Sequence, residues 1–356
     1  MKDTDIEILS EDAINLTDNE WLKIENLIKE FPSDSNILHN VVYLKNKLLK
    51  SPYGQCFITR VIDKNKNCLG FCSMTKKIFL NSDKSIPTFE FGDVYLNRKL
   101  QGKWVFLRMI RSCFKHFKKS FSEAFVFATA NRLSQPWLIR GGFKVFDYQL
   151  YFKILPTKLY LAVKSPILKI IFSMINPIYI VLIKSILFLF SKNNNISITK
   201  VNDLDEFPEI HQPNHDIELD RSRKYLFWRF INNPHTYDLY KVSYKKNFIG
   251  YAVFSEVRYK ESKKLFLADV SISGNYIIYS RSIISKILLS YYKINDYVYI
   301  ATCLSKKSNF WKNLFYCFPI RYNKIPFIIY EDLSPKSLVN VNDKKIHFVL
   351  GDGDNI

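Results

Sequence analysis

Several features that would place this chain in a well-defined class are missing from its 356 residues. The six cysteines include no C-x-x-C pair, and a chain of this length needs no disulfide staples, so we expect reduced thiols. The N-terminal residues are polar and lack the apolar core of a signal peptide. The sequence also shows no recognisable nucleophile–base motif. These absences predict a cytoplasmic protein without disulfides.

Acidic residues are scarce, with 33 Asp and Glu against 52 Lys and Arg, which gives a formal net charge of +19. Such a field favours anionic partners, including nucleotides, CoA, nucleotide-sugars, nucleic acid and acidic membrane surfaces. A lysine-rich composition in which lysines merely solvate the surface would give the same total. The charge alone therefore does not choose a partner.

Long uncharged apolar runs are missing as well, except for one candidate region at residues 165–190. Lys169 and Lys184 leave only residues 170–183 uncharged, and Pro177 lies inside that stretch. A membrane-spanning helix needs roughly 20 apolar residues. We therefore expect a linker helix packed on the neighbouring domains. The alternative is an interfacial helix that places the protein peripherally on the inner face of the membrane.

Length and composition indicate two domains, because domains run about 100–200 residues and hydrophobic residues make up 47% of this chain. The polar stretch 191–195 follows the apolar region and marks a boundary. We predict an N-terminal domain at 1–153, an apolar linker at 154–195, a C-terminal domain at 196–335 and a tail at 336–356.

Hydrophobic periodicity predicts a similar order of elements in both halves. In the first half we expect strands at 6–9, 55–62, 69–80, 87–96 and 124–129, and helices at 19–31, 36–49, 102–119 and 135–140. Asp18 is the expected N-cap of the first helix. In the second half we expect strands at 239–243, 248–256, 265–272 and 297–302, and a helix at 281–293. Each half is therefore predicted to be an α/β (α+β) domain, with a mixed, largely antiparallel sheet flanked by helices.

A short residue pattern also occurs once in each half, which favours a duplicated fold. Ala-Thr ends a strand and is followed by Ser, by Trp three residues later, and then by Phe. The two copies are Ala128, Thr129, Ser134, Trp137 and Phe143, and Ala301, Thr302, Ser308, Trp311 and Phe318.

The segment 95–106 joins a predicted strand to a predicted helix, and it is a candidate anion site. A helix N-terminus offers unpaired backbone N–H groups and a partial positive charge, which together bind phosphate. Gly102 lets the backbone come close to an anion, and Lys99 and Lys103 add charge. The alternative is a plain strand–helix turn that needs one glycine.

This segment resembles the acyl-CoA loop of the GNAT acyltransferase superfamily, whose pattern is Arg/Gln-x-x-Gly-x-Gly/Ala. Gln101 matches the first position, and residues 131–134 with 141–143 resemble the downstream Asn…Ala/Ser…Gly-Phe signature. The resemblance covers roughly residues 6–153 and 196–332. It implies two tandem GNAT-like domains and an acyl-CoA site in the first. The implied cofactor residues are Leu96, Gln101, Gly102, Lys103, Trp104, Val105, Phe106, Asn131 and Ser134.

The sequence departs from the family pattern at three positions. Trp104 and Phe106 replace the two cradle glycines, and a tryptophan at 104 would crowd the pyrophosphate. Leu138 stands where many members place a tyrosine general acid, so Tyr148 or Tyr151 would have to supply it. The second half has one glycine, Gly274, in the corresponding loop, so we expect a structural or acceptor-binding domain there.

Acyl transfer to an amine requires a deprotonated amine, a polarised thioester carbonyl and a route for the proton. In the resemblance the base comes from the strand before the loop. Glu90 is the first choice, acting directly or through water, and Asp93 is the second. The alternative for each is a solvated strand carboxylate. The implied reaction moves an acetyl or other acyl group from acyl-CoA to an amine.

The segment 221–230 resembles one in tandem GNAT-like proteins of bacterial surface-polysaccharide clusters. This implies an anionic acceptor such as an amino-sugar nucleotide, and Arg221 and Arg223 would clamp it. Alternatively, the segment is a solvated helix start whose aromatic residues Tyr225, Trp228 and Phe230 lie in the core. The i,i+4 histidines at 211 and 215 flank Pro213, which disfavours a helix, so we expect no metal site.

Two alternatives remain open. A Fem-like aminoacyl transferase also pairs two GNAT-type domains, lacks the glycine loop and uses aminoacyl-tRNA near the membrane. Trp104 and the positive charge suit this alternative, whereas the Gln101–Gly102 pair suits CoA. The other alternative is a non-catalytic tandem domain that binds a partner or a membrane surface.

Overall fold

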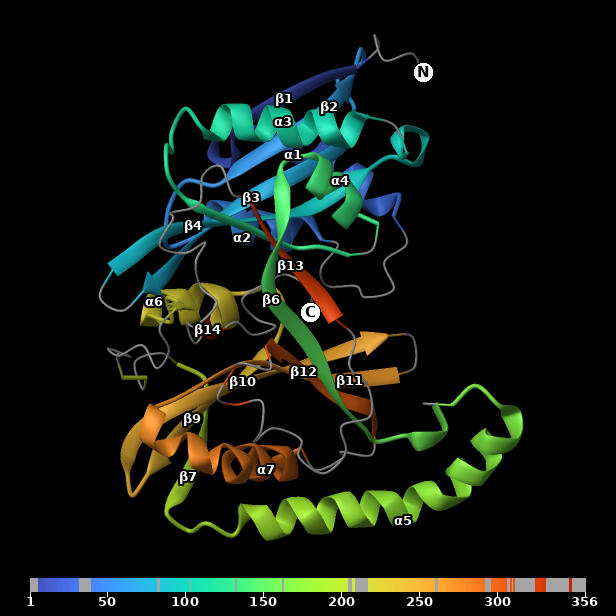
Figure 1. Ribbon diagram of the computed structural model, residues 1–356, viewed down its shortest axis with the longest axis vertical. Coiled ribbons are helices and arrows are strands. Elements are labelled where there is room, and N and C mark those ends of the chain that lie inside the picture. Colours follow the sequence, from blue (N-terminus) through green and yellow to red (C-terminus); the bar gives the residue numbers. More distant parts are fainter. Residues whose placement is uncertain are drawn as a thin grey trace.

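The computed structural model consists of two mixed sheets flanked by helices, so the predicted α/β class is confirmed (Figure 1). It describes residues 6–31, 40–81, 84–102, 104–131, 133–161, 163–203, 207–208, 217–259, 262–291, 296–305, 308, 310, 324–330 and 346–347.

The N-terminal sheet is built from antiparallel neighbours and one parallel strand. β1 (Ile6–Asp12), β2 (Phe57–Asp63), β3 (Cys68–Asn81) and β4 (Lys84–Leu96) follow one another antiparallel, and β5 (Phe125–Thr129) lies parallel to β4. The predicted hairpin turn is present at 63–67, where the Asp63 carboxylate accepts from the Asn67 N–H. All five predicted strands of this half therefore form.

Helices cover both faces of this sheet. α1 (Asp18–Lys29), the 3-10 turn η2 (Ala13–Asn15) and α2 (Val41–Leu49) pack on one face, and α3 (Val105–Phe117) and α4 (Gln135–Arg140) pack on the other. The predicted N-cap of α1 is wrong by one residue. Thr17 caps the helix because its hydroxyl and the Glu20 carboxylate form a reciprocal capping box.

The C-terminal half repeats this order of elements. β7 (Ile196–Val201), β9 (Tyr237–Tyr244), β10 (Asn247–Tyr259) and β11 (Ser262–Ile272) are antiparallel neighbours, and β12 (Tyr297–Ser305) is parallel to β11. The 3-10 turn η7 (Gly274–Tyr279) and α7 (Ser280–Ser290) follow β11 just as η3 (Arg98–Leu100) and α3 follow β4. The fold is duplicated.

The two halves exchange strands. β13 (Lys324–Tyr330), late in the chain, inserts between β5 and the first part of β6 (Phe143–Pro156). The second part of β6 pairs with β12 in the other half. In addition, β8 (Ile217–Leu219) pairs with the end of β3 and with β14 (Ile346–His347). Backbone hydrogen bonds therefore link both sheets, and β6 and β13 cross in the centre of Figure 1.

A shared core fills the space between the halves. The first half contributes Phe79, Phe125 and Phe127 to this core. The second half contributes Tyr225 of α6 (Arg223–Leu226), and Trp228 and Phe230 of the π-helical turn η6 (Phe227–Ile231). The indole of Trp228 donates to the backbone carbonyl of Asn46 at 3.1 Å. These aromatic residues are core, as one of the two interpretations of segment 221–230 expects.

The apolar region forms one long helix, α5 (Pro166–Ser191), which is preceded by the turn η4 (Leu159–Leu161). Tyr179, Ile180, Ile183 and Leu187 are buried, and the helix packs beside α7. Most of its other apolar side chains are exposed. The expected packing on the domains is therefore present on one face only.

Candidate functional site

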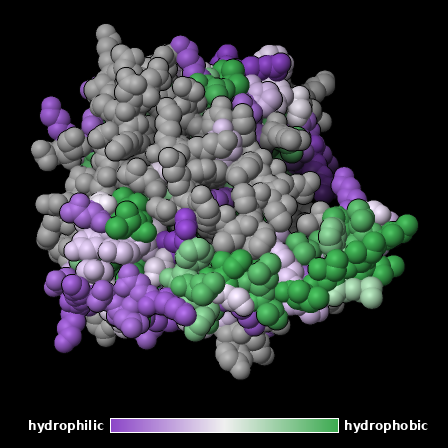
Figure 2. Space-filling view, turned by 60° about the horizontal axis from the view of Figure 1, so that its bottom comes forward, coloured by the Kyte–Doolittle hydropathy of each residue, from purple (hydrophilic) through white to green (hydrophobic). Residues whose placement is uncertain are grey.

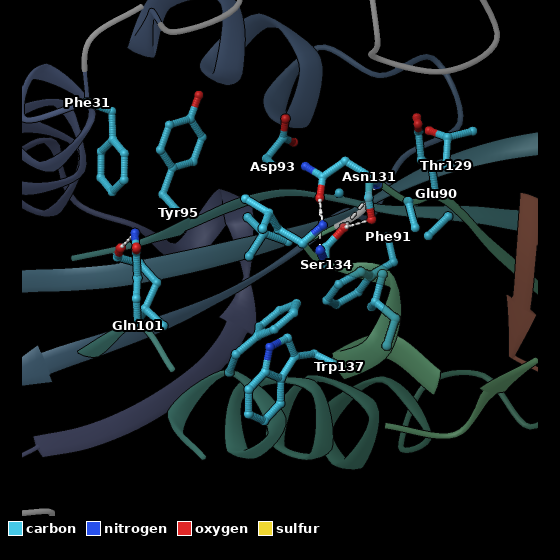
Figure 3. Close-up of a pocket in the computed structure, with 18 of the residues that line it drawn as sticks. Phe31, Glu90, Phe91, Asp93, Tyr95, Gln101, Thr129, Asn131, Ser134 and Trp137 are labelled. Carbon is cyan, nitrogen blue, oxygen red and sulfur yellow. Dashed lines mark hydrogen bonds between the residues drawn. The ribbon is translucent and has the colours of Figure 1, made fainter. Parts of the chain in front are cut away.

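A cavity lies in the N-terminal sheet where β4 and β5 diverge. Their parallel ladder runs from Thr88–Phe125 to Glu90–Phe127 and ends there. Beyond it lies the cavity, of about 590 Å³, lined by residues 90–96 of β4 and 128–131 at the end of β5. Figure 3 shows Gln101 at one end of this cavity and Glu90 at the other. Diverging strands leave backbone N–H and C=O groups along their edges, which a bound molecule can pair with.

A β-bulge shapes the β4 wall of the cavity. Phe71 faces Tyr95 and Ser73 faces Gly92, so the single residue Cys72 opposes both Asp93 and Val94. Asp93 adopts φ +49°, a left-handed conformation that Asp tolerates better than most residues. Such bulges recur beside active sites, where they redirect a side chain.

The Asp93 carboxylate is held by two contacts. It accepts from Lys47 Nζ at 2.7 Å and from Ser73 Oγ at 2.5 Å. The bulge thus places a paired carboxylate in the cavity wall, and its lysine partner comes from α2.

Glu90 also lines the cavity, as the sequence predicts, but it has a cationic partner. Lys77 Nζ lies 2.7 Å from Glu90 Oε2, and both side chains are nearly fully buried. Burial lowers the pKa of Lys77, and the nearby Arg229 also lowers it, whereas the Glu90 carboxylate raises it. Lys77 and Glu90 therefore form a buried ion pair in the wall of the cavity.

The predicted loop lies at the other end of the cavity. The Gln101 side-chain amide donates to the Leu96 carbonyl at 2.9 Å, which ties the loop to the end of β4. Gly102 has φ +75°, so glycine is required by the backbone here. α3 starts three residues later, and Phe106 from its first turn also lines the cavity. Lys103 lies outside the described residues.

Trp104 replaces a cradle glycine in the sequence, but its side chain does not enter the cavity. Its side chain is 61% exposed and makes an edge-to-face contact with Trp137, with ring centroids 6.1 Å apart. Val105 is buried in the hydrophobic core between α3 and the N-terminal sheet. Neither residue lines the cavity, so the bulky substitution at 104 leaves it open.

Asn131 and Ser134 line the cavity, but their side chains serve the backbone (Figure 3). Asn131 Oδ1 accepts from the N–H groups of Leu133 and Ser134 at 2.9 and 2.8 Å, and Ser134 Oγ accepts from the Asn131 N–H. These bonds close a turn directly before α4, whose N-cap is Ser134.

The structure supplies tyrosines that the sequence reasoning did not select. Leu138 is buried in the cavity wall, whereas Tyr151 of β6 pairs with β12 and β13 and does not line the cavity. The side chain of Tyr148 is not described. Tyr43 of α2 and Tyr95 of β4 line the cavity instead.

Tyr43 belongs to a network that joins the two halves. Its hydroxyl accepts from Arg229 NH1 at 2.9 Å, and burial raises its pKa. The sequence analysis did not select four residues around the cavity: Tyr43, Lys47, Lys77 and Arg229. Their spacing in the sequence gives no sign that α2, β3 and η6 lie close to one another beside β4.

The predicted acceptor clamp is not at the cavity. Arg221 is buried and contacts the Asp269 carboxylate at 3.3 Å and the Leu219 carbonyl at 3.0 Å. Arg223 is half-buried at the start of α6. His211 and His215 lie outside the described residues. Within the described ranges, no group of three or more His, Cys, Asp or Glu residues could hold a metal ion.

Neither a protein-family model nor a curated protein matches this sequence, but its fold matches solved structures. Yeast (Saccharomyces cerevisiae) N-myristoyltransferase with bound myristoyl-CoA and inhibitors gives a TM-score of 0.61 at 13% identity, over 92% of this chain and 80% of that one. A GCN5-related N-acetyltransferase from Anabaena variabilis gives 0.56 at 10% identity, over 91% and 72%. A tandem GNAT protein from the clavulanic acid biosynthesis pathway gives 0.55 at 10% identity, over 92% and 98%.

These matches cover both halves of the chain and establish its fold. The chain has the tandem GNAT fold, which is also the fold of N-myristoyltransferase. This fold resembles that of acyl-CoA N-acyltransferases.

Proposed function

We propose that this protein is an N-acyltransferase that binds acyl-CoA in its N-terminal half and transfers the acyl group to an amine. The observation that carries the proposal is the cavity between the diverging ends of β4 and β5, bounded by the turn at Gln101 and Gly102. The fold supports it, because the similar structures include an N-acetyltransferase and an N-myristoyltransferase with bound myristoyl-CoA.

The elements around the cavity suit the parts of acyl-CoA. The open edge of β4 after Glu90 offers backbone groups to the amides of the pantetheine arm. The positive-φ turn at Gly102 and the N-terminus of α3 offer backbone N–H groups to the phosphates. The net charge of +19 favours a polyanionic donor.

In the proposed reaction the neutral amine attacks the thioester carbonyl carbon, and a tetrahedral intermediate forms. It collapses when the carbon–sulfur bond breaks and the CoA thiolate leaves, and the proton lost by the amine must be accepted. Glu90 is the proposed acceptor, directly or through water, and the buried Lys77 orients its carboxylate through the 2.7 Å contact. Asp93 positions the bulge and is the second candidate.

The acceptor is proposed to be a small amine. Its assignment to an amino-sugar nucleotide or related anionic precursor rests on the sequence resemblance alone, since Arg221 and Arg223 lie away from the cavity. Acetyl-CoA is the first donor to test, followed by longer acyl-CoAs.

The test is isothermal titration of the purified protein with acetyl-CoA and myristoyl-CoA, with a cavity-filling variant beside it. Gly92 lines the cavity, and a Cβ added there meets no atom within 4 Å. Gly274 is equally open but lies after β11 in the other half. We expect micromolar binding that Gly92→Leu weakens by about 100-fold, because the added side chain takes ligand space, and that Gly274→Leu leaves unchanged.

Absence of binding by folded wild-type protein would refute the acyl-CoA assignment. If that protein instead retarded tRNA in a salt-sensitive gel shift, the aminoacyl-tRNA alternative would replace it. Once an acceptor is found, Glu90→Gln is expected to lower kcat by about 100-fold with acyl-CoA affinity unchanged.

A further inference from the structure

Helix α5 presents an apolar surface to the solvent. Over 18 of its residues the mean hydropathy is 2.0, and only 22% of that window is buried. Figure 2 shows the resulting hydrophobic band along one side of the molecule. The exposed residues that form it, here called the outer stripe, are Ile167, Ile170, Ile171, Met174, Ile178, Val181, Leu182, Phe188 and Leu189.

The outer stripe lies on one face of the helix, opposite the packed face. Its members recur at steps of three or four residues, with three adjacent pairs and one longer step of six, and at about 100° per residue they therefore share a side. The buried residues Tyr179, Ile180, Ile183 and Leu187 follow the same spacing on the other side. An ordinary surface helix is apolar inside and polar outside, whereas α5 is apolar on both faces. Its solvent-facing side is thus built to be covered.

Charge indicates what covers it. No acidic residue occurs between Asp147 and Asp203, a stretch that includes all of α5. Lys164, Lys169, Lys184 and Lys192 are all exposed along this helix and at its ends. An apolar face bordered by lysines without acids matches an anionic lipid surface, where apolar burial and attraction to the headgroups act together.

We propose that α5 docks this protein on an anionic lipid bilayer, with the helix in the plane of the membrane. Its other face is already fixed to the protein: the Tyr179 hydroxyl donates to the Pro156 carbonyl at 3.0 Å, and Asn176 accepts from the Leu159 N–H at 2.8 Å. A transmembrane orientation would break both bonds and carry Lys184 into hydrocarbon.

Docking through α5 leaves the acyl-CoA cavity free. In Figure 1 α5 lies beside α7 at one end of the molecule, whereas α3 and α4, which border the cavity, lie at the other. The membrane proposal stands on α5 alone and does not depend on the proposed acyl transfer.

The experiment is flotation of the full-length protein with phosphatidylcholine vesicles, with and without about 30% phosphatidylglycerol. The test variant is Ile170→Glu/Met174→Glu/Ile178→Glu, at positions that are 64%, 75% and 72% exposed. The matched control, Ile14→Glu/Leu22→Glu/Val42→Glu, makes the same charge change at exposed apolar residues of the N-terminal half, away from α5. Circular dichroism and thermal unfolding check that both variants fold.

We expect wild type and control to float with anionic vesicles at least about tenfold more than with neutral ones, and raised salt to release them. The test variant is expected to stay in solution. Equal flotation of test and control variants, or no flotation of folded wild type, would overturn the proposal. So would resistance to alkaline carbonate extraction, which indicates a spanning helix. Light scattering that shows a wild-type dimer and a monomeric test variant, without flotation, would assign the stripe to a second copy of the chain.

Discussion

The two halves have similar strand ends, and the one in the N-terminal half borders the cavity. β4 ends in Asp93-Val94-Tyr95-Leu96 and β11 in Asp269-Val270-Ser271-Ile272, opposite Gly70 and Gly250 respectively. In both halves the next N–H donates back to the neighbouring strand at 2.8 Å, from Asn97 to the Leu69 carbonyl and from Ser273 to the Ile249 carbonyl.

The aspartates at this shared position have opposite surroundings. Asp93 lies in the cavity wall at φ +49° with its side chain 13% exposed, and it pairs with Lys47. Asp269 is 0% exposed and is enclosed by Arg221, the Tyr251 hydroxyl and the Val270 N–H. The duplicated strand therefore provides a carboxylate twice, and the local backbone and packing decide whether it borders a cavity or completes a core.

The largest expected effect comes from separating the halves. Because β13 completes the N-terminal sheet and β6 completes the C-terminal one, we expect the fragment 1–195 alone to show no cooperative thermal unfolding. Co-expression with 196–356 is expected to restore a cooperative transition. A stable, cooperatively unfolding 1–195 fragment would show that the halves are independent despite the exchanged strands.

The next prediction compares the two aspartates by the same substitution. Asp269→Asn removes the carboxylate from the buried ion pair with Arg221 and is expected to lower the free energy of unfolding by about 3–5 kcal/mol. Asp93→Asn is expected to lower it by about 1 kcal/mol, since the Asp93 side chain is 13% exposed and borders the cavity. Urea denaturation measures both. Equal losses would mean that the cavity does not change the environment of the pair.

A smaller effect concerns the core of the C-terminal half. Burial, with Arg229 nearby, lowers the pKa of His235 from 6.5 to about 4. Between pH 4 and pH 6.5 the His235 imidazole is mostly protonated in the unfolded chain and mostly neutral in the folded one. Stability is therefore full above pH 6.5 and falls by about 3 kcal/mol toward pH 4.

His235→Gln is the control for this pH dependence, since an amide can still bond to Ser255 but does not titrate. Urea denaturation across this pH range should show wild type losing more stability than the variant. Parallel curves would contradict the shifted pKa.

The smallest expected effect tests the departure at Trp104. Trp104→Ala removes an exposed ring and one contact with Trp137, so we expect a loss of about 1 kcal/mol or less and acyl-CoA affinity within about threefold of wild type. A large gain in affinity on titration would show that the tryptophan obstructs the cofactor.

Local sequence determined most of the elements and part of the site. Alternation and helical periodicity are properties of a few consecutive residues, so the β2–β3 hairpin, α4 and the repeated order of strands were predictable. Glu90, Asp93, Gln101 and Gly102 could be predicted to lie near one another for the same reason, because one strand–turn–helix segment carries them all, and they line one cavity.

Only the tertiary structure decided what surrounds those residues. The exchange of β6 and β13, the lysine partners of both carboxylates and the burial of Arg221 depend on elements far apart in the chain. Pairing over such distances follows from the packing of whole sheets, which no local pattern encodes. The same holds for α5: its composition gave an apolar helix, and its contacts with the C-terminal half decided which face remained exposed.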